Sequence, residues 1–262
     1  LIAEAIEALH PGLVTLSRLV LGAGMLALLP RTRAVRVARG DWPRVALLGL
    51  TWFAIPQTMF PIAEQSVSSA ITGMLNGAMP MFTAAIAAVL LRRAPARRQR
   101  QGIAIGLVGV VMMAVPSLGE GGTATGMAMV LFGVISYAVA TNIVVPLQHR
   151  YGSLAVTARA QAVGVVMTVP YALWGWGESS WQWSSVVAVV VLGVVGTGMA
   201  FVVAGSLMGR VGATRGSVVA YLIPVVALVV GVTFRGDDVA LLAVAGLAVV
   251  LVGAWLTSRA GR

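Results

Sequence analysis

One arginine lies deep within an apolar segment of the sequence, and its chemistry gives the first functional indication. Arg18 is near the middle of the run from Pro11 to Pro30. If that run crosses a membrane, the charge costs about 2.5 to 3.5 kcal/mol even on the lenient insertion scale. A guanidinium kept in such a place can bind a carboxylate or another anionic group of a ligand. The alternative is a structural arginine that binds carbonyls or an acid, or that extends toward the surface.

Polar and aromatic side chains within other apolar runs form a second candidate group, and together they predict a wide, weakly polar pocket with aromatic walls. These residues are Trp52, Gln57, Asn76, Tyr137, Asn142, Gln161 and Tyr221. Taken singly, each also fits an interhelical hydrogen bond or a packing contact. Pro80 and Pro224 follow two members of the group by four and three residues. Each proline removes a backbone donor and loosens a turn, so both are predicted to be helix kinks or hinges.

Residues suited to covalent or acid–base catalysis are scarce. There is no cysteine, and His10 and His149 fall at the ends of apolar runs. Neither histidine is part of a metal-ligand cluster or a Ser-His-acid constellation. Glu64 is a candidate proton-coupling carboxylate or an ordinary helix-boundary residue, and Arg159 is close enough to a segment end to extend into the interface. We therefore expect no enzyme activity, no catalytic residue, no metal and no cofactor.

The elements that carry these residues are predicted from composition. Of 262 residues, 59% are hydrophobic and only 10% are charged, which excludes a soluble domain of this size. Nine apolar runs are long enough to cross a bilayer as helices. They extend from Pro11 to Pro30, Arg44 to Ile62, Val67 to Leu91, Gln101 to Pro116, Gly126 to Pro146, Leu154 to Trp174, Ser184 to Leu207, Thr214 to Phe234 and Val239 to Thr257. The predicted fold is an all-α integral membrane protein, a multi-pass helical bundle.

Charge is sorted between the connections of these nine segments. Apart from Arg18 and Arg159, fifteen of the sixteen arginines fall in or at the ends of alternate connections or at the C-terminus, while all acidic residues except Asp41 fall in the other set with Arg235. By the positive-inside rule the basic set is cytoplasmic. The net charge of +10 therefore describes orientation and does not indicate a nucleic-acid partner. We expect a bacterial inner (plasma) membrane protein with a cytoplasmic C-terminus.

The chain also resembles itself at an offset of 144 residues, which indicates an internal repeat. The matching pairs are Pro80 with Pro224, Gly102 with Gly246 and Gly109 with Gly253. The predicted repeats are residues 1–116 and 126–258, with four and five helices. Leu1 to Ala8 would then be the last turns of a first helix, and the parent would have ten. Five helices per repeat force the two repeats into opposite orientations, a construction common in secondary transporters.

These residues resemble a known family. The run from Pro80 to Leu91, a basic turn and then Gly102 and Gly109 are similar to the repeated EamA domain of the drug/metabolite transporter superfamily, as is the second copy from Pro224 to Gly253. Arg18 resembles an arginine that many members carry in their second helix, and Gln161 is its repeat partner. Members usually have a glutamate after the proline-containing helix. Arg93 and Asp237 occupy those places here, so the role of that glutamate does not carry over.

The resemblance implies a secondary transporter that works by alternating access, and we expect it to export a small amphipathic or anionic metabolite or drug. Arg18 would be the polar anchor and the second candidate group would line the pocket. The expected partners are the lipid bilayer and a small-molecule substrate, with protons as the candidate coupling ion and a homodimer as the candidate assembly. The alternatives are a flippase for lipid carriers or metabolites and a membrane protein with a purely structural role.

Overall fold

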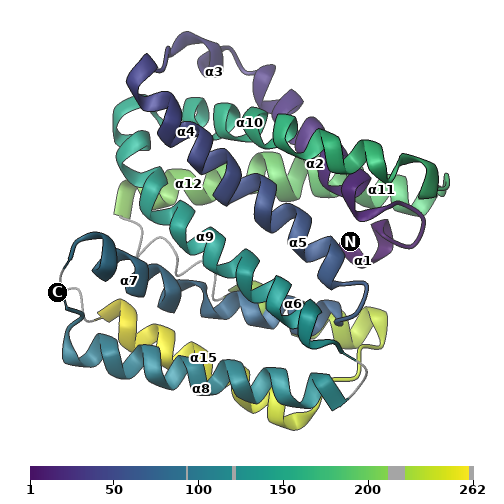
Figure 1. Cartoon of the computed structure of the whole chain (residues 1–262), viewed down its shortest axis with the longest axis vertical. Helices are drawn as coiled ribbons and strands as arrows, with labels where there is room; N and C mark the ends of the chain where they lie inside the picture. The colour runs from purple at the N-terminus through teal and green to yellow at the C-terminus, as the bar shows by residue number, and fades with distance from the viewer. Residues whose placement is uncertain (93, 120–121, 212–221, 260–262) are drawn as a thin grey trace. The chain divides into compact units, whose positions relative to one another are not determined.

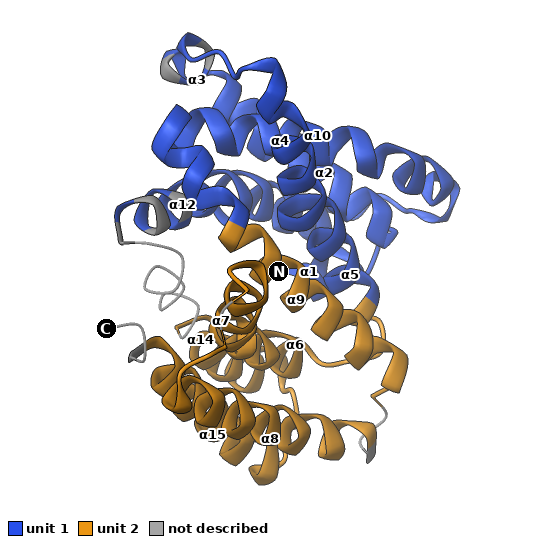
Figure 2. Ribbon diagram, turned by 60° about the vertical axis from the view of Figure 1, so that its left-hand side comes forward, with its two compact units in different colours: residues 1–62, 143–212 blue, residues 63–142, 213–262 orange. Residues whose placement is uncertain are grey.

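The computed structural model describes residues 1–92, 94–119, 122–211 and 222–259, and all regular secondary structure in these ranges is helical (Figure 1). Two compact units share the chain (Figure 2). Unit 1 comprises Leu1–Ile62 and Ile143–Gly212, and unit 2 comprises Ala63–Asn142 and Ala213–Arg262. Each unit thus contains segments from both halves of the sequence.

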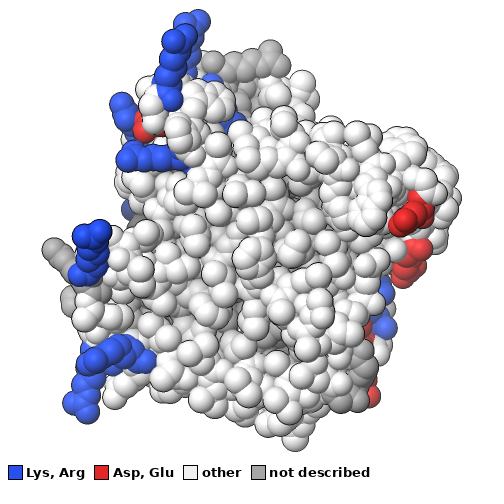
Figure 3. Space-filling view, in the orientation of Figure 1, with Lys and Arg blue, Asp and Glu red and all other residues white. Residues whose placement is uncertain are grey.

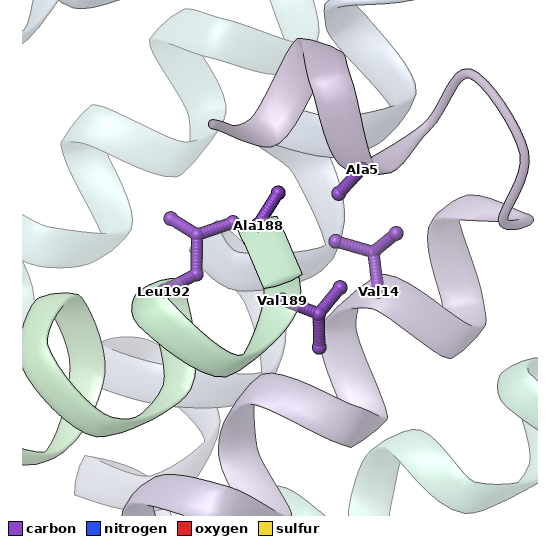
Figure 4. Packing of buried hydrophobic residues seen from close by; sticks show 5 residues of the cluster. All are labelled: Ala5, Val14, Ala188, Val189 and Leu192. Atoms are coloured by element: carbon purple, nitrogen blue, oxygen red, sulfur yellow. The ribbon is translucent and has the colours of Figure 1, made fainter. Parts of the chain in front are cut away.

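Unit 1 is built from two long helices, two segmented ones and short connecting turns. Its elements are α1 (Ile2–Ala5), α2 (Pro11–Ala27), α3 (Pro30–Ala34), η1 (Arg39–Asp41), α4 (Trp42–Leu48), η2 (Gly49–Ala54), α5 (Ile55–Ala63), the end of α9, α10 (Ser153–Trp174), η4 (Trp176–Glu178), α11 (Trp183–Val191), η5 (Leu192–Met199) and α12 (Ala200–Val211). A buried cluster of Ala5, Val14, Ala188, Val189 and Leu192 packs α1, α2, α11 and η5 together (Figure 4).

Unit 2 contains the remaining helices. They are α6 (Ser69–Leu75), η3 (Asn76–Ala78), α7 (Met79–Leu90), α8 (Arg97–Gly119), α9 (Ala124–Tyr151, as far as Asn142), α14 (Leu222–Val230), η7 (Gly231–Arg235) and α15 (Leu241–Arg259). Polar side chains cap the first turns of helices in both units. His10 accepts from the Gly12 N–H at 3.1 Å before Pro11, and Ser68 accepts from the Ile71 N–H at 3.3 Å. Such caps satisfy backbone donors that a helix start leaves without partners.

The described helices agree with the predicted membrane segments. Seven are long and apolar enough to cross a membrane, and Pro11–Ala27 and Leu222–Arg235 are two shorter apolar helices. Each of the nine predicted runs overlaps one of them, although the start of the run from Thr214 to Phe234 lies outside the described residues. This agreement confirms a multi-pass helical fold. Helices suit a bilayer because each one satisfies the hydrogen bonds of its own backbone.

Helices related by the 144-residue offset pack in pairs that run antiparallel. In unit 2, Gly109 of α8 lies against Gly246 of α15, and Gly102 lies against Gly253, so the residue numbers rise on one helix as they fall on the other. In unit 1, α2 and α10 show the same arrangement, with Gly12 against Tyr171 and Gly22 against Gln161. Related helices that point in opposite directions are the structural signature of an inverted repeat.

Two π-helical segments occupy the same place in the repeat. Gly49–Ala54 forms η2 and Leu192–Met199 forms η5, and an offset of 144 places the first within the second. Each packs parallel to the long helix of the other half: a Cβ at Gly49 would lie 2.6 Å from the Ala160 carbonyl of α10, and one at Gly193 would lie 3.0 Å from the Arg18 carbonyl of α2. π-Helical turns are rare and concentrate at functional sites.

Candidate functional site

A layer of buried polar side chains surrounds α2 inside unit 1, and we call Thr15, Arg18, Gln57, Gln161 and Thr197 the α2 polar layer. All five are at most 6% exposed. They come from four elements, because α2 packs against α5, α10 and η5. The Thr15 hydroxyl donates to the backbone carbonyl of Gln57 at 2.7 Å. The layer is therefore held together across helices that are far apart in sequence.

Arg18 is fixed in this layer by the π-helical segment η5. Its Nε donates to the Thr197 hydroxyl at 3.1 Å, and that hydroxyl in turn donates to the Leu192 carbonyl, five residues earlier, at 2.8 Å. Close approach of α2 and η5 depends on glycine, since a Cβ at Gly22 would lie 2.9 Å from the backbone carbonyl oxygen of Gly193. The guanidinium is thus positioned within the helix packing, with a neutral hydroxyl as one partner.

Gln161, the repeat partner of Arg18, is in the same layer on the opposite helix. Its Nε2 donates to the Leu19 carbonyl at 3.4 Å, and its side chain lies over Gly22. Within the described residues, its Oε1 is buried without a hydrogen-bond partner. A buried amide oxygen left in this state is costly, so this oxygen is a candidate acceptor for a ligand donor.

Trp52 belongs to an aromatic cluster next to this layer. Its ring centroid is 5.4 Å from that of Phe53 and 5.2 Å from that of Phe201, and the two phenylalanines are 4.8 Å apart. Trp52 is only 2% exposed. Thr197 and Phe201 were missed by the sequence analysis. Their spacing of four residues, about one helical turn, places them on one face of a helix, but this spacing is common in apolar segments and does not distinguish a site.

The remaining candidate residues are in unit 2. The Asn142 amide donates to the carbonyls of Thr83, at 3.2 Å, and Ala138, at 2.9 Å. The Asn76 amide donates within its own helix to the Thr72 carbonyl at 3.4 Å. Tyr137 is half-buried on α9, and Tyr221 lies outside the described residues. Asn142 and Asn76 thus donate to backbone carbonyls. Such bonds fit the alternative in which each polar side chain serves helix packing.

The two prolines differ in their local structure. Pro80 lies in the first turn of α7, directly after the 3-10 segment η3, so the segment from Ser69 to Leu90 changes helix type just before it. Pro224 is the third residue of α14 and is buried. A Cβ built at Gly77 would lie 3.2 Å from the Pro224 Cγ. The assignment of both as hinges stays a prediction.

Comparison with known proteins assigns the family. The EamA-like transporter family matches residues 1–115 and 124–259. The chain belongs to the EamA-like transporter family. It is 28% identical over 266 residues to a probable terminal-alkyne amino-acid exporter of Streptantibioticus cattleyicolor, covering 98% of this chain and 89% of the relative. It is also 25% identical over 224 residues to an uncharacterised transporter of Archaeoglobus fulgidus, covering 86% of this chain and 80% of that protein.

A third relative and a solved structure agree with this assignment. An uncharacterised transporter of Bacillus subtilis is 24% identical over 270 residues, covering 98% of this chain and 84% of the relative. A crystal structure with 19% sequence identity superposes with a TM-score of 0.70 and covers 98% of this chain and 90% of its own, which shows a shared fold. This EamA protein is thus a membrane transporter.

Charged side chains of this EamA transporter gather at opposite ends of the unit 1 helices (Figure 3). At the end near α3, the Asp41 carboxylate is 5% exposed and accepts from the Tyr151 hydroxyl at 2.5 Å and from Arg150 at 2.6 Å. At the other end, Glu178 lies 3.7 Å from the His10 ring. The basic end therefore encloses one buried carboxylate that ties the α3–α4 connection to the end of α9.

Asp237 occupies the place where the family resemblance implies a glutamate. Asp237 follows η7, and its Oδ2 accepts from the Ala70 N–H at 2.9 Å. Ala70 is in the first turn of α6, where a carboxylate satisfies a free backbone donor and interacts favourably with the helix dipole. Asp237 is thus a helix-capping residue in this structure. Arg93, at the equivalent place in the first repeat, lies outside the described residues.

Proposed function

We propose that this EamA transporter exports a small amphipathic or anionic metabolite or drug by alternating access, with Arg18 as the polar anchor for a negatively charged group. The observation that carries the proposal is the buried guanidinium in the middle of α2, positioned on Thr197 of η5. An ionisable residue within a membrane segment is costly and is by default a candidate for substrate binding. Gln161 contributes an amide oxygen to the same layer.

Alternating access is supported by the packing of repeat-related helices. The pairs α2–α10 and α8–α15 each join one helix from each half in opposite directions. Two inverted halves can exchange conformations, so that the site faces first one side and then the other. Since Arg18 is 6% exposed here, the proposal requires that η5 move away from α2 in another conformer. The glycines of η5 and its π-helical backbone make it a suitable element for this movement.

The substrate class is inferred from chemistry and from one relative. A cationic anchor with an amide neighbour and aromatic residues nearby fits a molecule that combines a carboxylate with an apolar part. The relative from Streptantibioticus cattleyicolor is named as an exporter of an amino acid. An amino acid with an apolar side chain is therefore the first substrate class to test, and protons are the proposed coupling ion.

Transport in proteoliposomes tests this proposal. The purified chain should accumulate a radiolabelled apolar amino acid above the level of empty liposomes, and an imposed proton gradient should increase the rate. The matched amino-acid amide, which lacks the carboxylate, should be transported at least about tenfold more slowly, because the loss of one charge-assisted hydrogen bond is worth about 1.5–3 kcal/mol. Equal rates for the acid and its amide would contradict the role of an anionic group.

We also propose that the basic end of the unit 1 helices faces the cytoplasm and that the C-terminus of the chain lies on the same side of the membrane. Because the chain has no cysteine, single cysteines report accessibility without background. Gly40 at the basic end of unit 1 and Gly177 in η4 at the acidic end are both exposed, and no other atom lies within 4 Å of a Cβ at either. In intact cells a membrane-impermeant maleimide should label Gly177→Cys and not Gly40→Cys. The reverse pattern would show the opposite orientation.

A further inference from the structure

Unit 1 contains an open groove of about 470 Å³ between α2 and α10, toward its basic end. We call it the α2–α10 groove. Its trough is made of small side chains from both helices: Ala23, Gly24, Ala27, Ala158 and Ala162. Thr32 and Arg159 complete the lining. The groove is distinct from the α2 polar layer, whose residues are buried and do not line it.

Arg159 brings a positive charge into this groove, and the hydrogen bonds that the structure describes for it go to backbone carbonyls. Its Nη1 donates to the carbonyls of Ala155, at 3.0 Å, and Thr32, at 3.1 Å, and its Nη2 donates to the Val35 carbonyl. These bonds use three of the five N–H donors of a guanidinium and leave two. In the described part of the chain, no carboxylate lies within 4.0 Å of Arg159. An anion in the groove would supply the missing charge.

Thr32 adds a second polar group to the same end. It is 6% exposed, and its hydroxyl has no hydrogen-bond partner among the described residues. A buried hydroxyl without a partner is uncommon and energetically unfavourable. The guanidinium and this hydroxyl together give the groove one polar end, while its alanine and glycine trough is apolar.

The surroundings of the groove indicate what kind of molecule would fit an apolar trough with one polar end. The two helices that form the trough also carry exposed apolar side chains: Val20 on α2 is 47% exposed, Leu28 at the end of α2 is 78% exposed and Val166 on α10 is 71% exposed. Such a surface is suited to contact with acyl chains. On the connection that Arg159 contacts, Arg36 and Arg39 are exposed, and basic residues next to a membrane segment attract anionic lipid. A molecule with a phosphate at one end and a hydrocarbon chain at the other complements both parts.

We propose that the α2–α10 groove binds an anionic phospholipid, with the phosphate on Arg159 and one acyl chain along the alanine and glycine trough. The small side chains leave room for the chain, since no atom lies within 4 Å of a Cβ at Gly24. This site is independent of the proposed substrate and of the direction of transport. The bound lipid fastens α2 to α10, the repeat-related pair that carries the α2 polar layer.

Native mass spectrometry of the purified chain tests the site with phosphatidylglycerol and phosphatidylcholine of the same acyl chains. We expect at least one phosphatidylglycerol to remain bound at activation energies that remove phosphatidylcholine. Gly24→Leu fills the trough, keeps every arginine and should weaken phosphatidylglycerol binding about tenfold. Arg159→Gln should do the same, whereas Arg36→Gln removes an equal charge outside the groove and should change binding less than twofold. Inorganic phosphate at millimolar concentration should not displace the lipid.

Four outcomes would overturn the proposal. Equal retention of the two lipids would exclude recognition of the anionic headgroup. Equal losses in Arg159→Gln and Arg36→Gln would show general attraction to the basic end. Unchanged binding in Gly24→Leu would exclude the trough, and this variant decides the question even if Arg159→Gln fails to fold. Displacement by inorganic phosphate would assign the site to a free anion.

Discussion

Replacing Arg18 with glutamine should reduce export of a carboxylate-bearing substrate by roughly tenfold to more than a hundredfold while leaving the transporter folded. The substitution keeps a long polar side chain that can still reach Thr197, now 3.1 Å from the Arg18 Nε, but it removes the charge. A hydrogen bond to a charged group contributes about 1.5–3 kcal/mol, which corresponds to that range in affinity. Substrate-dependent proteoliposome uptake measures the effect.

Thr197→Val is the matched control for this substitution. It preserves side-chain shape, removes the hydroxyl that accepts from Arg18 and leaves the guanidinium in place. If Arg18 binds substrate, Thr197→Val should lose less transport activity than Arg18→Gln, because the charge that binds the substrate is still present. If Arg18 only holds η5 against α2, the two variants should lose activity equally. Unchanged transport of every tested substrate by Arg18→Gln would refute the anchor role.

The second large effect is expected at the contact between α8 and α15. Gly253→Ala should destabilise the protein by about 1–3 kcal/mol, the usual consequence of overpacking. Its new Cβ would lie 2.5 Å from both the Gly102 carbonyl and the Gly106 nitrogen, which are backbone atoms and cannot rotate away. Unfolding of the purified protein, followed by circular dichroism, measures the change.

Gly24→Ala provides the control, because Gly24 is also within a long helix but has no atom within 4 Å of a Cβ position. There the substitution should stabilise the protein by about 0.5–1 kcal/mol, since alanine favours the helix over glycine. Similar effects of the two substitutions would show that α8 and α15 do not pack as closely as described.

The candidate site was only partly accessible from the sequence. Arg18 and Gln161 were identified because a charge and an amide are conspicuous within apolar runs, and the repeat relates them. Thr197 and Phe201 were not identified, because a threonine and a phenylalanine are ordinary residues in an apolar segment and acquire meaning only from what they contact. Arg159 was expected to extend to the interface. It does contact the α3 connection, but its acceptors are backbone carbonyls, which no side-chain pattern reveals.

The sequence by itself determined the helical membrane class, the approximate segments and the sorting of charge along the chain, and it predicted the repeat. These follow from properties that are local along the chain: an apolar run must satisfy its backbone internally, and charge collects where the run ends. Only the tertiary structure decided that the compact units combine segments from both halves, that η2 and η5 are π-helical, and that α2 and α10 leave a groove beside Arg159. These features depend on which helices touch, and glycine allows that contact wherever two backbones approach too closely for a side chain.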